Sequence, residues 1–229
     1  TVTSVNYAFA SIPAPNSVHP VTLTYSDSAG NSHSHDLAVA ITVDYKGIPA
    51  SFASTTVDKS TRGFIANVTQ ISTIQIETAQ WIHGNSLATA EKQLAGLYLN
   101  PNEWDDDDNP LPYLNEADPD AWDGWSITPV EVDGVINWNQ FEGIAIGNFG
   151  EDQAIPQIPG WGDSDDGIVA EILGYLELKK GLNTLGVNSD EGFSLSIGPN
   201  PKDKLGVIAG EFDGNRASSD TIFNIVVAE

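Results

Sequence analysis

The stretch GYLELKKGLNTLGVNSDEGFSLSIG, residues 174–198, determines the fold that we expect for this chain. Apolar residues recur along Leu182–Asn188 and along Phe193–Ile197, and both segments have the length of a strand. Turn-forming residues, Asp190, Glu191 and Gly192, lie between them. The stretch therefore predicts two consecutive β-strands joined by a tight turn.

Strand signals of the same kind occur on both sides of this stretch. Val18–Tyr25 and Asp36–Asp44 flank a turn-forming segment at residues 26–31, which predicts a hairpin. Turns with glycine separate most of the other predicted strands, which are Gly63–Val68, Ile71–Glu77, Phe141–Phe149, Val169–Leu178, Leu205–Phe212 and Thr221–Val227.

One segment, residues 85–95, predicts a helix. Asn85 or Ser86 can cap its N-terminus and Gly96 can close it. Four residues follow the 3–4 spacing of a helix face: Leu87, Ala90, Glu91 and Leu94. The chain is therefore predicted to be mostly β with one short helix, most simply a β-sandwich or jelly roll.

Acidic residues are concentrated in the second part of the chain. Of the formal charge of −23, residues 1–100 carry −2 (6 acids, 4 bases) and residues 101–229 carry −21 (26 acids, 5 bases). Such a surface repels nucleic acid and anionic membranes, so we expect neither as a partner. No apolar run approaches the ~18–20 residues of a membrane-spanning helix, so we expect no membrane insertion.

The composition favours an extracellular protein. The chain has no cysteine, which excludes disulfides and thiol chemistry. Few lysines combined with abundant Asp, Asn, Ser, Thr and Gly is a composition typical of secreted or cell-surface bacterial proteins. We therefore expect an extracellular or cell-surface location.

The stretch 174–198 also carries a family resemblance. Its strand, turn with glycine, second strand, acidic turn and third strand resemble the core of a PA14-type β domain. Residues 209–212 and 223–227 fit the closing strands of that family. Other segments resemble a PA14-like module of very large secreted or surface proteins of environmental bacteria, in which the module follows an Ig-like β segment: residues 85–96, 112–118 and 136–140.

This resemblance implies two domains and non-catalytic binding. An Ig-like β segment would occupy residues 1–74, and a PA14-like domain with a long acidic loop at 101–167 would occupy residues 75–229. PA14 domains serve in carbohydrate binding or adhesion, and in sugar-binding adhesins paired Asp residues hold a Ca²⁺ that ligates sugar hydroxyls. The matching pair here is Asp190 and Glu191, in which Glu replaces the second Asp.

The acidic loop is a candidate calcium region in its own right. Between Lys92 and Lys179 the chain has no basic residue but 19 carboxylates. The repulsion among these carboxylates is relieved when they are widely separated in solvent or when cations bind to them. We expect at least one bound Ca²⁺, and the alternative is a merely solvated acidic loop. The candidate ligands form three clusters: Asp105, Asp106, Asp107 and Asp108; Asp118, Asp120 and Asp123; Asp163, Asp165 and Asp166.

Tryptophans in the same region are candidate sugar-binding residues. An indole ring stacks on a sugar face while neighbouring acids or amides bind its hydroxyls. Trp104, Trp122, Trp125 and Trp161 lie beside acids or glycine in turn-like sequence, whereas Trp138 is expected to be packed. The alternative is that these side chains anchor the large loops to the core.

No catalytic motif accompanies these features. The sequence contains no P-loop, no G-x-S-x-G and no H-E-x-x-H, so we expect no enzyme. It predicts a Ca²⁺-binding module for adhesion or carbohydrate binding, with a glycan as partner. The alternative is a structural repeat of an extracellular fibre or stalk, which assembles with neighbouring copies through β-strand contacts.

Overall fold

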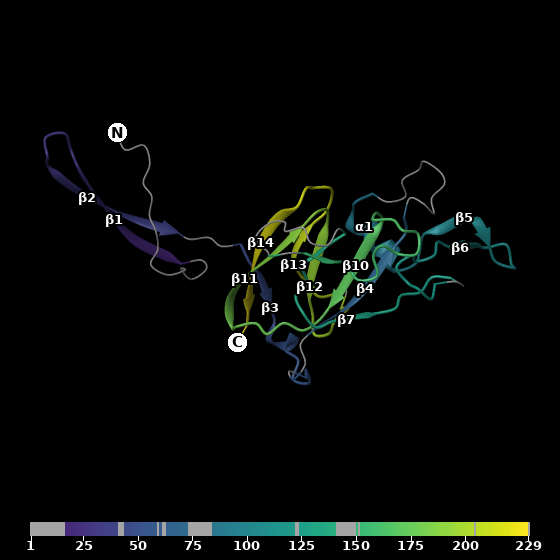
Figure 1. The fold of residues 1–229 in the computed structure, drawn as a ribbon. Coiled ribbons are helices and arrows are strands. Elements are labelled where there is room, and N and C mark those ends of the chain that lie inside the picture. The colour runs from purple at the N-terminus through teal and green to yellow at the C-terminus, as the bar shows by residue number, and fades with distance from the viewer. Residues whose placement is uncertain are drawn as a thin grey trace.

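The fold is mostly β, with one α-helix among the residues that the structure describes (Figure 1). A computed structural model describes residues 17–40, 44–58, 60, 63–72, 84–121, 124–140, 150, 152–203 and 205–228. The predicted sandwich-like β fold with one short helix is confirmed. In chain order the elements are β1 (Val18–Ser26), β2 (Ser32–Ala40), β3 (Lys46–Ile48), the 3₁₀ turn η1 (Ala50–Phe52), β4 (Phe64–Gln70), α1 (Leu87–Leu94), β5 (Leu99–Trp104), β6 (Pro110–Pro112), β7 (Val130–Val132), β8 (Trp138–Asn139), β9 (Gln153–Ala154), β10 (Ile168–Leu173), β11 (Gly181–Ser189), β12 (Phe193–Ile197), β13 (Val207–Phe212) and β14 (Ser219–Val227).

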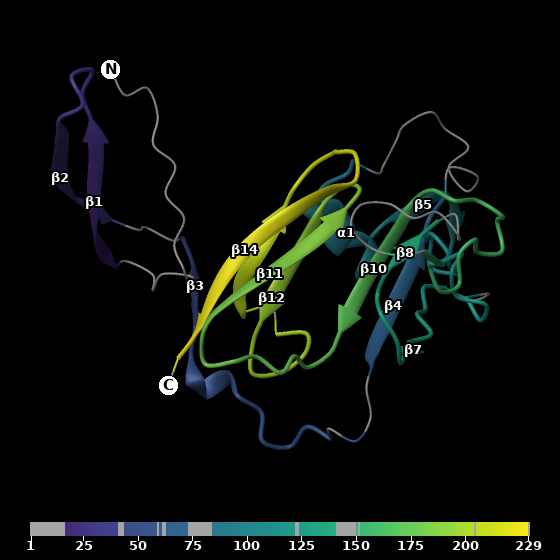
Figure 2. The same ribbon diagram turned by 60° about the vertical axis from the view of Figure 1, so that its left-hand side comes forward.

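Strands β1 and β2 form the predicted N-terminal hairpin. They pair antiparallel, from Val18 opposite Ala40 to Ser26 opposite Ser32. No other described strand joins their sheet. Figures 1 and 2 both show the hairpin apart from the remaining sheets, and nearly all of β2 is exposed. The hairpin therefore has no core of its own within the described part of the chain.

The C-terminal strands form a two-layer sandwich. One sheet has the order β11-β14-β3, and β12 pairs with β13 in the other. Ile48 of β3, Ala209 of β13 and Ile225 of β14 are buried together in its core. The strands predicted at 182–188, 193–197, 205–212 and 221–227 all occur, with boundaries that differ by a few residues.

A second core is built on the sheet β10-β4-β7. Ala66 and Val68 of β4 are fully buried and pack against Ala117 and Ile158 from the acidic region. Strand β4 pairs antiparallel with β10, and β3 pairs parallel with β14. The sheets β10-β4-β7 and β11-β14-β3 therefore each contain strands from before and after the domain boundary that is predicted between residues 74 and 75.

The helix α1 has the predicted caps. The Ser86 hydroxyl accepts a hydrogen bond from the Thr89 backbone N–H at 3.2 Å, as an N-cap residue should. Gly96 follows the helix with a left-handed φ of 66°, and the Trp125 ring packed over it leaves no room for a side chain. The end of α1 is thus fixed by the left-handed Gly96 and by the ring packed over it.

The acidic region 101–167 contains more regular structure than the sequence predicts. It includes the hairpin β5-β6 and the short strands β7, β8 and β9. Prolines at 101, 110 and 112 disfavour strands in a sheet interior, but each strand of a two-stranded hairpin has a free edge that tolerates them. The strand predicted at 141–149 lies outside the described residues, as do residues 73–77 of the strand predicted at 71–77.

Candidate functional site

Buried polar side chains at the end of β4 hold the acidic loops in place. The Gln70 amide donates to the carbonyls of Ser164 and Asp166 at 2.8 and 2.9 Å, and its oxygen accepts from the Gly160 N–H at 2.9 Å. Gln93 of α1 donates to the carbonyl of Gly167 at 2.7 Å. These bonds tie residues 160–167 to the second core.

The turn at residues 115–118 is attached to the same strand. Asn115 accepts from the Gln70 N–H at 2.8 Å and donates to the carbonyl of Ser126 at 2.9 Å. The buried Glu116 carboxylate accepts from the Ser72 N–H and hydroxyl at 2.8 and 2.7 Å. Trp161 donates its backbone N–H to the Glu116 carbonyl at 3.1 Å. The second and third acidic clusters therefore begin from adjacent anchor points.

The cluster Asp105–Asp108 is the turn of the β5-β6 hairpin. Asp105 accepts hydrogen bonds from the backbone N–H groups of Asp107 and Asn109 at 2.9 and 2.8 Å. The bonds from the Asn109 backbone and side chain lower the pKa of Asp105 below its ordinary value. Asp106, Asp107 and Asp108 are exposed, and Asp108 has a left-handed φ of 60°.

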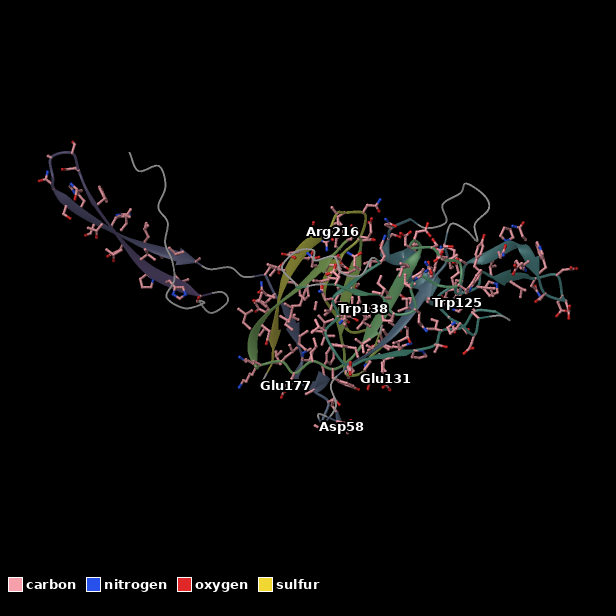
Figure 3. All side chains as sticks on the ribbon, viewed as in Figure 1. Asp58, Trp125, Glu131, Trp138, Glu177 and Arg216 are labelled. Carbon is pink, nitrogen blue, oxygen red and sulfur yellow. The ribbon has the colours of Figure 1, made fainter. Side chains whose placement is uncertain are left out.

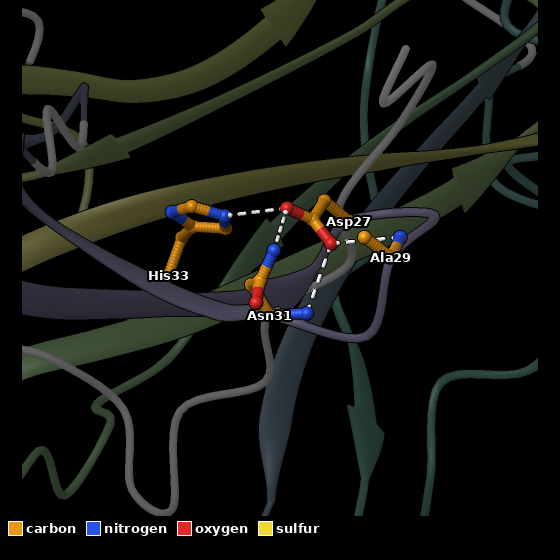
Figure 4. Close-up of polar contacts among 4 residues, drawn as sticks. All are labelled: Asp27, Ala29, Asn31 and His33. Carbon is orange, nitrogen blue, oxygen red and sulfur yellow. Dashed lines mark hydrogen bonds and ion pairs between the residues drawn. The ribbon is translucent and has the colours of Figure 1, made fainter.

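The turn of the β1-β2 hairpin has the same design (Figure 4). Asp27 accepts from the backbone N–H groups of Ala29 and Asn31, both at 2.9 Å, and from the Asn31 side chain. The two backbone N–H groups share one carboxylate oxygen, whereas the Asn31 side chain and His33, at 3.1 Å, both contact the other. Hydrogen bonds lower the pKa of Asp27 to about 2. The bond from the Asn31 side chain has the largest effect, and the bond from His33 has the next largest. An Asp followed four residues later by Asn therefore closes both hairpins.

The second cluster is divided between the interior and the surface. Asp118 is only 2% exposed, whereas Asp120 is exposed. Burial raises the pKa of Asp118, but hydrogen bonds from the Asp120 N–H and the hydroxyls of Ser126 and Thr128 outweigh it, so the pKa falls below its ordinary value. Asp123 lies outside the described residues.

The third cluster lies in the loop that Gln70 anchors. Asp163 and Asp165 are exposed, and Asp166 accepts from the Ser164 hydroxyl at 2.8 Å. Gly167 closes the loop with a φ of 64°, and a Cβ there would overlap the Ile71 carbonyl oxygen. The loop therefore depends on glycine at this position.

The pair Asp190 and Glu191 forms the turn between β11 and β12. Glu191 accepts from the Arg216 backbone N–H at 3.3 Å, and its own N–H donates to the Arg216 carbonyl at 3.2 Å. The Arg216 guanidinium donates to the Ser189 carbonyl and hydroxyl and to Thr221. Figure 3 marks Arg216 beside the C-terminal strands. It also lies 4.3 Å from the centre of the Phe212 ring. An arginine is thus the cation that organises this turn.

The candidate tryptophans differ in exposure. Trp104 and Trp161 are 56% and 55% exposed. The Trp125 ring packs over Gly96 and its Nε1 is buried without a hydrogen-bond partner, so this side chain anchors its loop. Trp138 packs against the second core, as expected. Trp122 lies outside the described residues.

Within the described residues, no group of three or more His, Asp or Glu side chains is arranged to hold a metal ion. None of the described helices could cross a membrane. Comparisons found no family model, no curated protein and no solved structure that matches this chain. The PA14-like resemblance and its calcium pair therefore stay predictions.

Proposed function

We propose that this chain is a non-catalytic extracellular β module that assembles with neighbouring copies of itself through the β1-β2 hairpin. The supporting observation is that this hairpin lies apart from both cores. Val18 and Leu37 are 65% and 43% exposed on it. A two-stranded hairpin is at best marginally stable alone in water, so packing or strand pairing with a partner would stabilise it.

The edge of β11 is the surface on another copy that suits the hairpin best. Strand β11 is nine residues long, as are β1 and β2, and no described strand pairs with its outer edge. Its sequence, GLNTLGVNS, contains neither a charged residue nor a proline, the usual protections of an open edge.

Charge supports the same partner. Two copies that each carry −23 repel one another over most of their surfaces. Strands β1 and β11 contain no Asp, Glu, Lys or Arg. Pairing of β1 of one copy with β11 of the next therefore brings no acidic side chains of the two strands together.

Sedimentation velocity over a range of concentrations tests this function. The wild-type chain should associate, and Leu37→Asp should weaken association by about tenfold or more, which corresponds to roughly 1.4 kcal/mol. The matched control is Leu205→Asp, because Leu205 is 94% exposed outside the hairpin and the change adds the same charge. A monomeric wild type, or equal effects of both substitutions, would contradict the proposal.

Calcium-dependent glycan binding is a second candidate function. Its support is the exposure of Trp104 beside the Asp105 turn and of Trp161 beside Asp163 and Asp165. Each indole could stack on a sugar while neighbouring carboxylates bind its hydroxyls or a Ca²⁺. A glycan array with and without chelator should show calcium-dependent binding that Trp161→Ala or Trp104→Ala removes. An array with no signal in calcium would exclude this candidate.

A further inference from the structure

Asn67, Glu171 and Lys202 meet at the sheet β10-β4-β7, although they lie far apart in the sequence. Glu171 of β10 is the direct cross-strand partner of Asn67 in β4. The side-chain nitrogen of Asn67, Nδ2, donates to Glu171 Oε2 at 2.6 Å, and Lys202 Nζ lies 3.0 Å from the same oxygen. Lys202 belongs to the loop between β12 and β13 of the sandwich. One carboxylate oxygen thus contacts an amide of the second core and an amine of the sandwich.

Asn67 occupies an unusual position for its residue type. Asparagine is depleted in β-strands, yet Asn67 lies between Ala66 and Val68 in the middle of β4 and is only 5% exposed. Its amide points to the carboxylate that also contacts the lysine. An amine, a carboxamide and a group that can carry a proton between them are therefore together.

The amine can reach the amide carbon after a small movement. Because both nitrogens contact Glu171 Oε2, they are separated by no more than the two contact distances together. Asn67 is held in its strand, whereas the Lys202 side chain is 57% exposed. Rotation of the flexible four-carbon stem of the lysine can bring Nζ to Asn67 Cγ while the backbone stays in place. Such proximity favours a reaction between the two side chains.

We propose that Lys202 Nζ attacks Asn67 Cγ and forms an amide bond within the chain, with loss of ammonia. Glu171 takes one proton from the Lys202 ammonium, which leaves a neutral amine as the nucleophile. The Nζ–Cγ bond forms while the carbonyl π electrons move to Oδ1. Glu171 then delivers the proton to Nδ2. The carbonyl re-forms, and the Cγ–Nδ2 bond breaks with its electron pair on nitrogen.

The atoms and charges of this reaction balance without a co-reactant. The proton that remains in excess on Nζ passes to the departing ammonia, so an ammonium side chain and a carboxamide become a secondary amide and an ammonium ion. No group is oxidised or reduced, and Glu171 ends as the carboxylate that it was at the start. The chain therefore contains every group that the step needs.

The bond would attach β4 to the loop between β12 and β13. The chain has no cysteine, so a disulfide cannot make such a connection. Like a disulfide, a covalent link between distant residues restricts the unfolded chain. The bond requires neither the hairpin contact nor a glycan, so its test is independent of both proposed functions.

The intact mass of the purified full chain tests the proposal. Loss of one ammonia should make the wild type about 17 Da lighter than its sequence. Lys202→Arg and Glu171→Gln should each have the full mass of their sequences, because the first removes the nucleophile and the second removes the proton acceptor. Lys46→Arg, the same change at a lysine of β3, is the matched control and should keep the loss. A wild type of full mass would overturn the proposal.

A tryptic map locates the bond. Trypsin does not cleave after a lysine whose amine is acylated, so the wild type should give one branched peptide that joins residues 63–92 to residues 181–204. Because Lys202 is more than half exposed, Lys202→Arg should fold and give the two peptides separately. An ammonia loss that persists in Lys202→Arg would indicate a succinimide at an asparagine and would overturn the proposal.

Discussion

Asn109 binds the Asp105 carboxylate through both its backbone and its side chain: the N–H donates at 2.8 Å, and the side-chain nitrogen lies 3.3 and 3.2 Å from the two carboxylate oxygens. The densest acidic cluster of the chain is thus built around a hairpin turn. Asp27 and Asn31 have the same relationship in the other hairpin. The Asp105 carboxylate accepts hydrogen bonds within the turn. The exposed Asp106, Asp107 and Asp108 beside it are therefore the acids that can contact solvent or ions.

The left-handed residue in this turn gives a stability prediction. Asp108 adopts a φ of 60°, a conformation that costs a residue with a side chain roughly 1 kcal/mol more than glycine. Asp108→Gly should therefore increase the free energy of unfolding by about 0.5–1 kcal/mol in urea denaturation. Asp106→Gly removes the same charge where φ is not left-handed and should give no gain. A loss of stability in Asp108→Gly would contradict this view of the turn.

The β1-β2 turn should lose stability in acid. The pKa of Asp27 is about 2 in the folded hairpin against an ordinary 3.8. Because the folded pKa is lowered, the stabilisation is complete above about pH 4 and is lost as the pH falls toward 2. Amide chemical shifts of Ala29 and Asn31 in an NMR titration should follow that transition. Their insensitivity over this range, or an unchanged titration in Asp27→Asn, would contradict the assigned hydrogen bonds.

Arg216 should be more important to the sandwich than a surface arginine usually is. Its guanidinium donates to Ser189 and Thr221 and lies over the Phe212 ring. Arg216→Ala should reduce the free energy of unfolding by about 2 kcal/mol, and Arg216→Lys should restore little of it, because lysine cannot supply the planar set of donors. Chemical denaturation of both variants measures the difference. A lysine variant as stable as the wild type would show that charge alone suffices.

Gly167 should tolerate no side chain. Its φ of 64° is left-handed, and a Cβ would overlap the Ile71 carbonyl oxygen. We expect Gly167→Ala to lower the free energy of unfolding by at least about 2 kcal/mol. Gly134→Ala is the matched control, since a Cβ there meets open space at an ordinary φ. Similar stabilities of the two variants would mean that residues 160–167 are not held as described.

Local signals predicted much of the fold. The apolar residues of Phe193–Ile197 lie in a strand with those same ends, and Ser86 and Gly96 cap the helix as their residue types indicate. The β5-β6 hairpin was missed because its prolines and aspartates disfavour strands, and only the position at a free edge makes them acceptable.

The polar supports of the acidic loops could not be predicted in this way. Gln70, Gln93 and Glu116 resemble ordinary surface residues in sequence, and each becomes buried only through partners far along the chain. The burial of the Asp118 carboxylate is likewise a product of tertiary structure. The spacing of the aspartates predicts Asp118 as a member of an acidic cluster, but it does not predict that Asp118 is the buried member.

Hydrogen–deuterium exchange at two protein concentrations tests the central claim most directly. If β1 of one copy pairs with the open edge of β11 on another, amides in residues 18–26 and 181–189 should exchange more slowly in the concentrated sample, while those of the buried strand β4 should not change. Identical exchange of both segments at the two concentrations would contradict assembly through the hairpin.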